Sequence, residues 1–235
     1  MLRLPITSLA VVAVVAVVAV MPVAVAAAVP AKPRFEFPAV KKQVTSEGGA
    51  AVLETVAGTK VMCKAVTNSG TIPANGANAV REATVTFTGC EADGFKCKTA
   101  GAAAGEVQTN MLKGQLGYLG TVGSGKVGVD LVAEAGELLA EISCAGGFAK
   151  AKLRGDLIGA IAPINVATKE FTLTFEQASG KQEWARIFLE EPFESGKYTE
   201  VASVAEVSID GFPFKDAGLE STEKVATEEN VKIVA

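Results

Sequence analysis

The chain of 235 residues contains no histidine. Histidine is the commonest general acid and base of enzymes and the commonest metal-binding side chain. Its absence excludes Ser-His-Asp and Cys-His nucleophile systems, together with every histidine metal site. Whatever this protein does, it does without the most widely used catalytic side chain.

Other residue types and patterns are scarce as well. Aromatic residues make up 6% of the chain, and Trp184, Tyr118 and Tyr198 are its only Trp and Tyr residues, which is little material for a sugar-binding cleft. The 22 basic and 26 acidic residues are spread along the chain, which argues against nucleic acid and against an anionic membrane surface as partners. Closely spaced cysteine pairs and Asp-x-Asp-x-Asp-Gly loops are missing too, so we expect no metal and no cofactor.

The N-terminus has the pattern of a secretory signal peptide. Arg3 is followed by an unbroken apolar run over Leu9–Val20, and Pro22 and small residues with the A-x-A pattern come next. This pattern predicts a signal peptide over residues 1–28, with cleavage near residues 26–28. An uncleaved anchor is the alternative, because apolar residues continue to Val29. After cleavage no membrane insertion is expected, and the predicted localisation is secreted or extracellular.

From Gly48 onward the sequence alternates with a period of two, which is typical of β-strands. Apolar residues alternate with threonine over Ala83–Phe87 and Phe171–Phe175, and with glycine and aspartate over Val127–Leu131. Turn signals such as Asp93-Gly94 join such runs. The pattern predicts an all-β fold, an antiparallel sandwich or barrel with short hairpin turns.

Helices are expected to contribute little. The best helical segments, Gln182–Glu190 and Ser221–Glu229, are short, so we expect at most one or two short helices rather than a parallel α/β sheet. Residues 29–45 carry three prolines and four basic residues, and we expect an exposed lead-in there. Residues 46–235 are expected to form a single β domain.

The four cysteines form an even set, which in an exported chain predicts two disulfides. Strand phase places Cys63 and Cys144 on the apolar faces of their strands. Cys90 is in phase with the threonines of its strand, on the polar side, and Cys97 lies across the Asp93-Gly94 turn. We therefore predict that Cys90 pairs with Cys97 and that Cys63 pairs with Cys144. Their spacing fits neither a zinc site nor a C-x-x-C redox pair.

Two motifs resemble functional signatures. Gly120–Val127 (GTVGSGKV) approaches a phosphate-binding loop, but Val127 stands where that loop needs Ser or Thr, and it begins a strand where the loop opens a helix. A glycine-rich hairpin turn is the favoured interpretation. Arg154-Gly155-Asp156 spells the integrin-binding tripeptide within a strand-like run, where a chance match is favoured.

Two carboxylates can hydrolyse glycosides without histidine, so acids are the remaining candidates for catalysis. A solvated surface role is the favoured interpretation for them. The candidate acids are Glu190, Glu191, Glu228, Glu229, Asp93, Asp130, Asp156, Asp210 and Asp216.

The segment ATVTFTGCEADGFKCKTAGAAAGEVQTNMLKGQLGYL, Ala83–Leu119, resembles a group of uncharacterised secreted two-disulfide proteins of high-GC actinobacteria. The likeness extends to Leu53–Ala65 (LETVAGTKVMCKA), Glu141–Gly147 (EISCAGG) and Asp210–Leu219 (DGFPFKDAGL). The resemblance implies export and paired cysteines, and no activity comes with it.

The sequence therefore favours an exported non-catalytic β-protein with a structural or binding role at the cell envelope or outside the cell. A carrier of a small molecule or lipid is the alternative, if the strands close around a cavity. A carboxylate-based hydrolase is a weaker alternative. The partner is unknown, with contact to the cell envelope or to a small apolar ligand left open.

Overall fold

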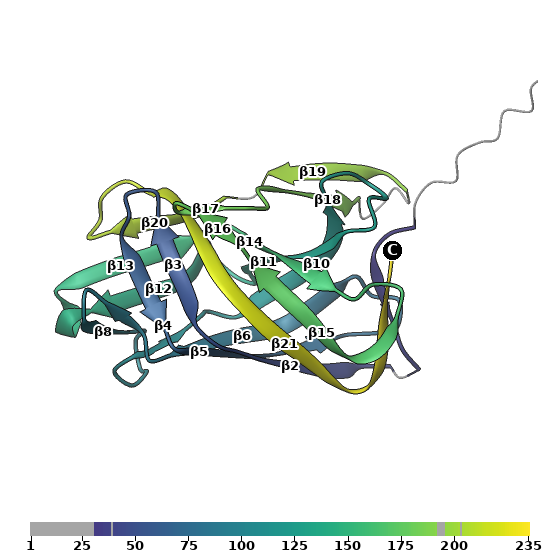
Figure 1. Ribbon diagram of the computed structural model, residues 1–235, viewed down its shortest axis with the longest axis horizontal. Coiled ribbons are helices and arrows are strands. Elements are labelled where there is room, and N and C mark those ends of the chain that lie inside the picture. Colours follow the sequence, from purple (N-terminus) through teal and green to yellow (C-terminus); the bar gives the residue numbers. More distant parts are fainter. Residues whose placement is uncertain (1–30, 39, 192–195, 203) are drawn as a thin grey trace, which may run out of the picture.

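The computed structural model describes residues 31–38, 40–191, 196–202 and 204–235, so the predicted signal peptide lies outside the described part. The described chain consists of antiparallel strands, and the 3-10 turn at Ala145–Gly147 is its only helical element (Figure 1). The predicted all-β class is confirmed.

Eight antiparallel strands close into a barrel, because each pairs with the next and the last pairs with the first. In the order of pairing they are β2 (Lys42–Gly48), β5 (Ala65–Ile72), β6 (Ala79–Thr88), β10 (Leu112–Leu119), β11 (Val127–Ala133), β14 (Leu157–Ala162), β15 (Ala167–Phe175) and β21 (Lys215–Val234).

Further strands lie outside this ring. One series of paired strands extends the barrel. It starts at the N-terminal part of β21, the long yellow strand that crosses the view in Figure 1, and its last strand pairs with the same part of β21. This extension comprises β3 (Ala51–Thr55), β4 (Lys60–Cys63), β7 (Glu91–Ala92), β8 (Phe95–Lys98), β12 (Leu138–Cys144), β13 (Ala149–Arg154) and β20 (Ala205–Ile209).

The other strands are short. β18 (Arg186–Glu190) and β19 (Tyr198–Ala202) form a hairpin attached to β10, at the top of Figure 1. β1 (Arg34–Glu36) pairs with β21 and β9 (Glu106–Gln108) pairs with β6, whereas β16 (Gln177–Ala178) and β17 (Lys181–Gln182) form a separate two-stranded sheet.

The apolar residues of the predicted alternating strands form the core. Phe171, Leu173 and Phe175 of β15 are buried, whereas Thr172 between them is exposed. One continuous apolar cluster of buried residues runs through the barrel and its extension, from Phe35 to Ile233 along the chain. The barrel and the extension therefore share a core.

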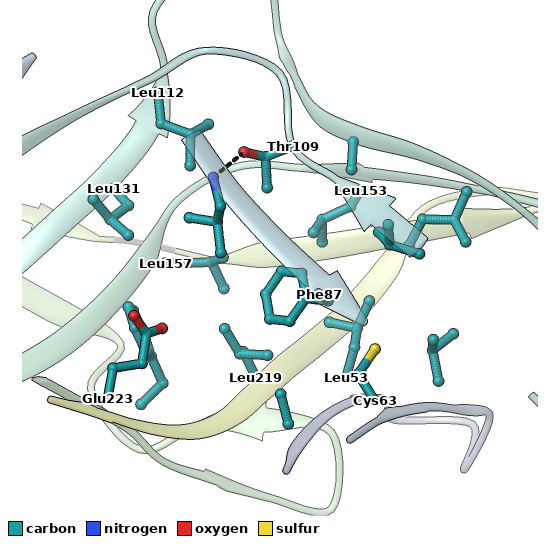
Figure 2. Close-up of a pocket in the computed structure, with 17 residues that line it drawn as sticks. Leu53, Cys63, Phe87, Thr109, Leu112, Leu131, Leu153, Leu157, Leu219 and Glu223 are labelled. Atoms are coloured by element: carbon teal, nitrogen blue, oxygen red, sulfur yellow. Dashed lines mark hydrogen bonds between the residues drawn. The ribbon is translucent and has the colours of Figure 1, made fainter. Parts of the chain in front are cut away.

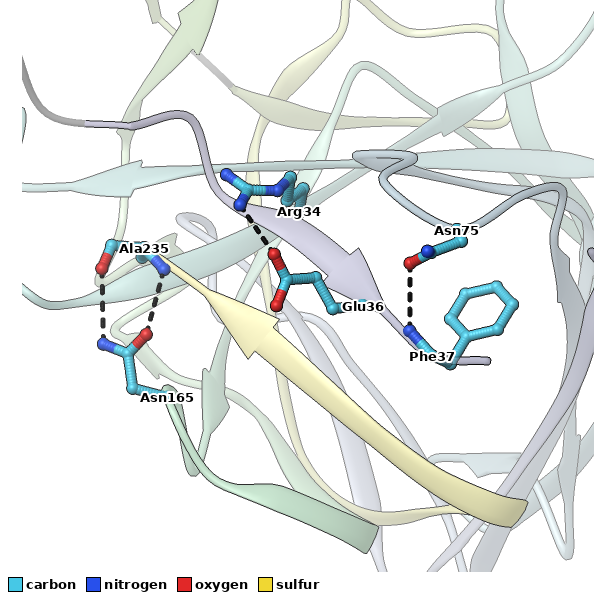
Figure 3. A network of polar contacts seen from close by, with 6 residues as sticks. All are labelled: Arg34, Glu36, Phe37, Asn75, Asn165 and Ala235. Atoms are coloured by element: carbon cyan, nitrogen blue, oxygen red, sulfur yellow. Dashed lines mark hydrogen bonds and ion pairs between the residues drawn. The ribbon is translucent and has the colours of Figure 1, made fainter. Parts of the chain in front are cut away.

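The expected exposed lead-in over residues 29–45 is wrong for most of its described part. Arg34–Glu36 pairs with the end of β21, and Phe35 and Phe37 are buried. Figure 3 shows how the segment is tied down, with the Phe37 amide donating to the Asn75 side chain at 3.0 Å. The prolines suggested an open segment, but they flank β1, and the Phe35 and Phe37 side chains pack into the core.

The two segments considered for helix contain no helix and consist mostly of strand. Arg186–Glu190 is β18, and Ser221–Glu229 lies inside β21. The second is rich in residues that favour helices, but Leu219, Ser221 and Glu223 face inward between exposed Glu220 and Thr222. Pairing with β2 and β15 on both sides decides its conformation, because tertiary context overrides local preference.

All four cysteines are in disulfides, but the predicted pairing is wrong. The bonds join Cys63 to Cys90 and Cys97 to Cys144. Cys63 and Cys144 face the core as expected, and Cys90 is fully buried as well. Gly89, with φ +66°, interrupts the alternation of β6, so Cys90 turns inward although its strand phase pointed outward.

The β7–β8 hairpin explains this pairing. Cys97 donates its amide to the Cys90 carbonyl at 2.9 Å, so the two lie opposite each other within the hairpin. Each of them forms its disulfide with a flanking strand. Cys97 lies directly opposite Cys144, and Met62 and Glu91, the neighbours of Cys63 and Cys90 in sequence, lie opposite each other. Each disulfide thus fastens one edge of the hairpin to its neighbour. Two such bonds indicate an oxidising compartment.

Candidate functional site

An apolar cavity of about 50 Å³ lies in the core where the barrel meets its extension. Leu53 and Leu219, Phe87 and Leu157 line it from different strands, as Figure 2 shows. The Thr109 hydroxyl, also in the lining, accepts the Val85 amide at 3.1 Å. Nearly all the remaining lining is hydrocarbon.

Glu223 is the one carboxyl in the lining of this cavity, at its edge in Figure 2. Its side chain is buried, and its Oε2 accepts hydrogen bonds from the Ser46 hydroxyl and, at 2.7 Å, from the Asn68 amide. Burial raises the pKa of Glu223, and the two hydrogen bonds oppose that change. Ser46 and Asn68 lie opposite each other in the β2–β5 ladder, so neighbouring strands hold the carboxyl in place.

The volume of the cavity limits what it can hold. Pockets for drug-sized ligands span about 300–1,000 Å³, and an engineered cavity of about 150 Å³ accepts benzene. A space of about 50 Å³ is too small for either. The barrel interior is therefore largely filled by its own side chains.

Among the candidate acids, the structure brings Asp130 and Asp156 close enough to influence each other. Asp130 is 5% exposed, and its Oδ1 has no hydrogen-bond partner. Burial, with a smaller contribution from the negative charge of Asp156, raises the pKa of Asp130 to about 7. Burial also raises the pKa of Asp156. The two side chains line different hollows on the surface, however, and do not converge on one cleft.

The other candidate acids have structural or surface roles. Glu190 pairs with Lys32 and Glu191 with Lys197, both at 3.1 Å. Three more acids lie elsewhere on the surface: Glu229 pairs with Lys42 at 2.6 Å, the Asp210 side chain accepts the Lys150 amide at 2.8 Å, and Asp216 accepts the Val56 amide through its backbone carbonyl. Asp93 and Glu228 are exposed.

The two signature-like motifs are parts of the scaffold. Gly120–Val127 is the turn that leads into β11, as predicted. Arg154 pairs with Glu206 at 2.8 Å and stacks on the Phe214 ring. Gly155 has φ +84°, and a Cβ there would lie 2.0 Å from the Val204 carbonyl oxygen. The tripeptide is thus built into the junction of β13 and β14.

Comparison with protein-family models, with curated proteins and with solved structures finds no significant match to this chain. Within the described residues, no group of three or more Cys, Asp or Glu side chains is placed to hold a metal ion. The described part of the chain also contains no helix of the length and apolarity that crossing a membrane requires.

Glu223 was not predicted as a site residue, because the segment Ser221–Glu229 was considered a possible helix and Glu223 was not among the candidate acids. The period-two phase of Leu219, Ser221 and Glu223 was a signal that could have found it.

Proposed function

We propose that this protein is an exported, non-catalytic β-barrel with a structural or binding role at the cell envelope or outside the cell. The largely filled interior carries the proposal, since the apolar core cavity of about 50 Å³ is too small for a small-molecule ligand and leaves the outer surface for binding. The two disulfides and the predicted signal peptide support export. The resemblance to secreted actinobacterial proteins agrees with it.

Native mass spectrometry of the secreted protein, without reduction, tests this proposal. We expect a chain cleaved near residues 26–28, four hydrogens lighter than the reduced form, with no co-purifying small molecule. Peptide mapping of the same sample should give the Cys63–Cys90 and Cys97–Cys144 pairs. A chain retained in the cytosol with free thiols would contradict the proposal.

A carrier of a small apolar ligand is the second candidate, favoured by the buried Glu223 beside an apolar cavity in a closed barrel. Such a carrier would have to widen its interior on binding. A stoichiometric apolar molecule, released from the purified protein by organic solvent and bound more weakly by a Glu223→Gln variant, would favour the carrier over the surface role.

A further inference from the structure

A polar groove runs along the outer face of the barrel beneath the β18–β19 hairpin. Its outer part has a volume of about 550 Å³, within the range of small-molecule sites. A smaller hollow of about 130 Å³ shares Ala79, Arg81 and Gln115 with it and ends at Asp130. The groove and the hollow therefore adjoin through these three shared residues.

The sheet places residues of this hollow in a row. Gln115 lies opposite Ala79 of β6 on one side and opposite Asp130 of β11 on the other. Asp130 in turn lies opposite Ile158 of β14, which packs in a small apolar cluster with Trp184. Asp130 is consequently desolvated on one side by hydrocarbon and borders the polar hollow on the other.

The groups left without a charge partner define what could bind. Arg81 and Lys113, which line the hollow, form no ion pair with any described residue, and the Asp130 Oδ1 accepts no hydrogen bond. The acids of the outer groove, Glu190 and Glu191, are already paired with lysines. Burying a carboxyl without hydrogen-bond donors costs free energy, so a cationic ligand at the Asp130 carboxyl would offset part of that cost.

From these groups we infer that the groove binds a small zwitterion, an amino acid or short peptide, with its ammonium group at Asp130 and its carboxylate at Arg81 and Lys113. The ammonium group gives the Asp130 carboxyl a charge-assisted partner at the hollow that it lines, and the nearby charge of Asp156 also favours a cation there. The guanidinium of Arg81 suits a carboxylate, which it can bind through two parallel hydrogen bonds. The inference rests on the binding role proposed above and specifies its ligand class.

Isothermal titration calorimetry with glycylglycine tests the assignment on the secreted, disulfide-bonded protein. We expect a Kd of about 1 mM or tighter. Acetyl-glycylglycine lacks the ammonium group and glycylglycinamide lacks the carboxylate, and each should bind at least about tenfold more weakly, since one charged contact is lost.

The variants separate a real site from a general affinity for small polar molecules. Asp130→Asn should lose the preference for glycylglycine over its acetylated form, and Arg81→Gln should lose the preference for the free carboxylate. Glu220→Gln, on an exposed position of β21 outside the groove, is the matched control and should bind as the parent does. Circular dichroism should show the parent fold in all three.

Absence of glycylglycine binding by the folded parent would overturn the inference, as would equal binding of the blocked derivatives or an unchanged preference in Asp130→Asn. None of these outcomes bears on the export and the absence of a co-purifying ligand, which native mass spectrometry tests. A negative result for the groove can therefore be distinguished from a negative result for the proposed function.

Discussion

Two buried carboxyls of this barrel have opposite surroundings. Glu223 faces inward and receives hydrogen bonds from Ser46 and Asn68, whereas Asp130 faces outward and its Oδ1 receives none. A buried carboxylate is tolerated when donors surround it and destabilising when they are missing. Asp130 therefore lowers the stability of the folded state whenever it is ionised, and groups perturbed in this way cluster at functional sites.

The stability of the protein should fall as pH rises, through Asp130. Its pKa is raised from 3.8 to about 7 in the folded state, so the folded protein binds a proton that the unfolded chain has already released. The stabilising effect is full below about pH 4 and is lost as pH rises to about 7. At about 1.4 kcal/mol per pH unit, the difference is about 4 kcal/mol.

Urea unfolding of the parent and of Asp130→Asn between pH 4 and pH 8 measures this contribution. The free energy of unfolding of the variant, relative to the parent, should increase by a few kcal/mol across this range, because Asn cannot ionise. Glu220→Gln serves as the exposed control and should follow the parent. A constant difference between Asp130→Asn and the parent at every pH would show that Asp130 does not titrate in this window.

At the scale of elements, the sequence predicted which face a residue occupies better than which strand lies beside it. Period-two alternation was sufficient to predict the all-β class and the inward direction of Cys63 and Cys144. It could not predict that Cys97 lies opposite Cys144, because register between distant strands depends on the closure of the whole sheet. The row formed by Ala79, Gln115, Asp130 and Ile158 could not be predicted for the same reason, because β6, β10, β11 and β14 bring these residues together only in the fold.

The β7–β8 hairpin should depend on its two disulfides. It consists of strands of two and four residues, too short to be stable alone, and Cys63–Cys90 and Cys97–Cys144 fasten it on both sides. In the chain-entropy model, loops of 27 and 47 residues correspond to about 3.5 and 4 kcal/mol.

Replacing both cysteines of one pair by alanine should therefore destabilise the protein by about 2–4 kcal/mol. The double variants Cys63→Ala/Cys90→Ala and Cys97→Ala/Cys144→Ala should both lower the melting temperature without leaving a free thiol. Hydrogen exchange should show the largest loss of protection in residues 91–98. If Cys90→Ala/Cys97→Ala instead formed a native Cys63–Cys144 bond with parent stability, the pairing seen in the structure would be wrong.

At the scale of the molecule, β21 connects the two parts of the sheet. Its first residues pair with β20 and β3 of the extension, and its later ones with β2 and β15 of the barrel. The cavity lies at this junction, lined by side chains from both parts, among them Leu53 and Leu157. Because the barrel and the extension share β21 and one apolar core, we expect the two parts to unfold together.

Leu219→Ala should thus weaken the whole molecule in one step. Leu219 is buried at the junction, and its truncation should cost about 2–5 kcal/mol, since it enlarges a cavity that already exists. Thermal unfolding followed by Trp184 fluorescence and by far-ultraviolet circular dichroism should give coincident transitions, both shifted to lower temperature. Val166→Ala, at an exposed position, is the control and should shift neither. Two separated transitions in the Leu219 variant would mean that the barrel and its extension unfold independently despite their shared strand.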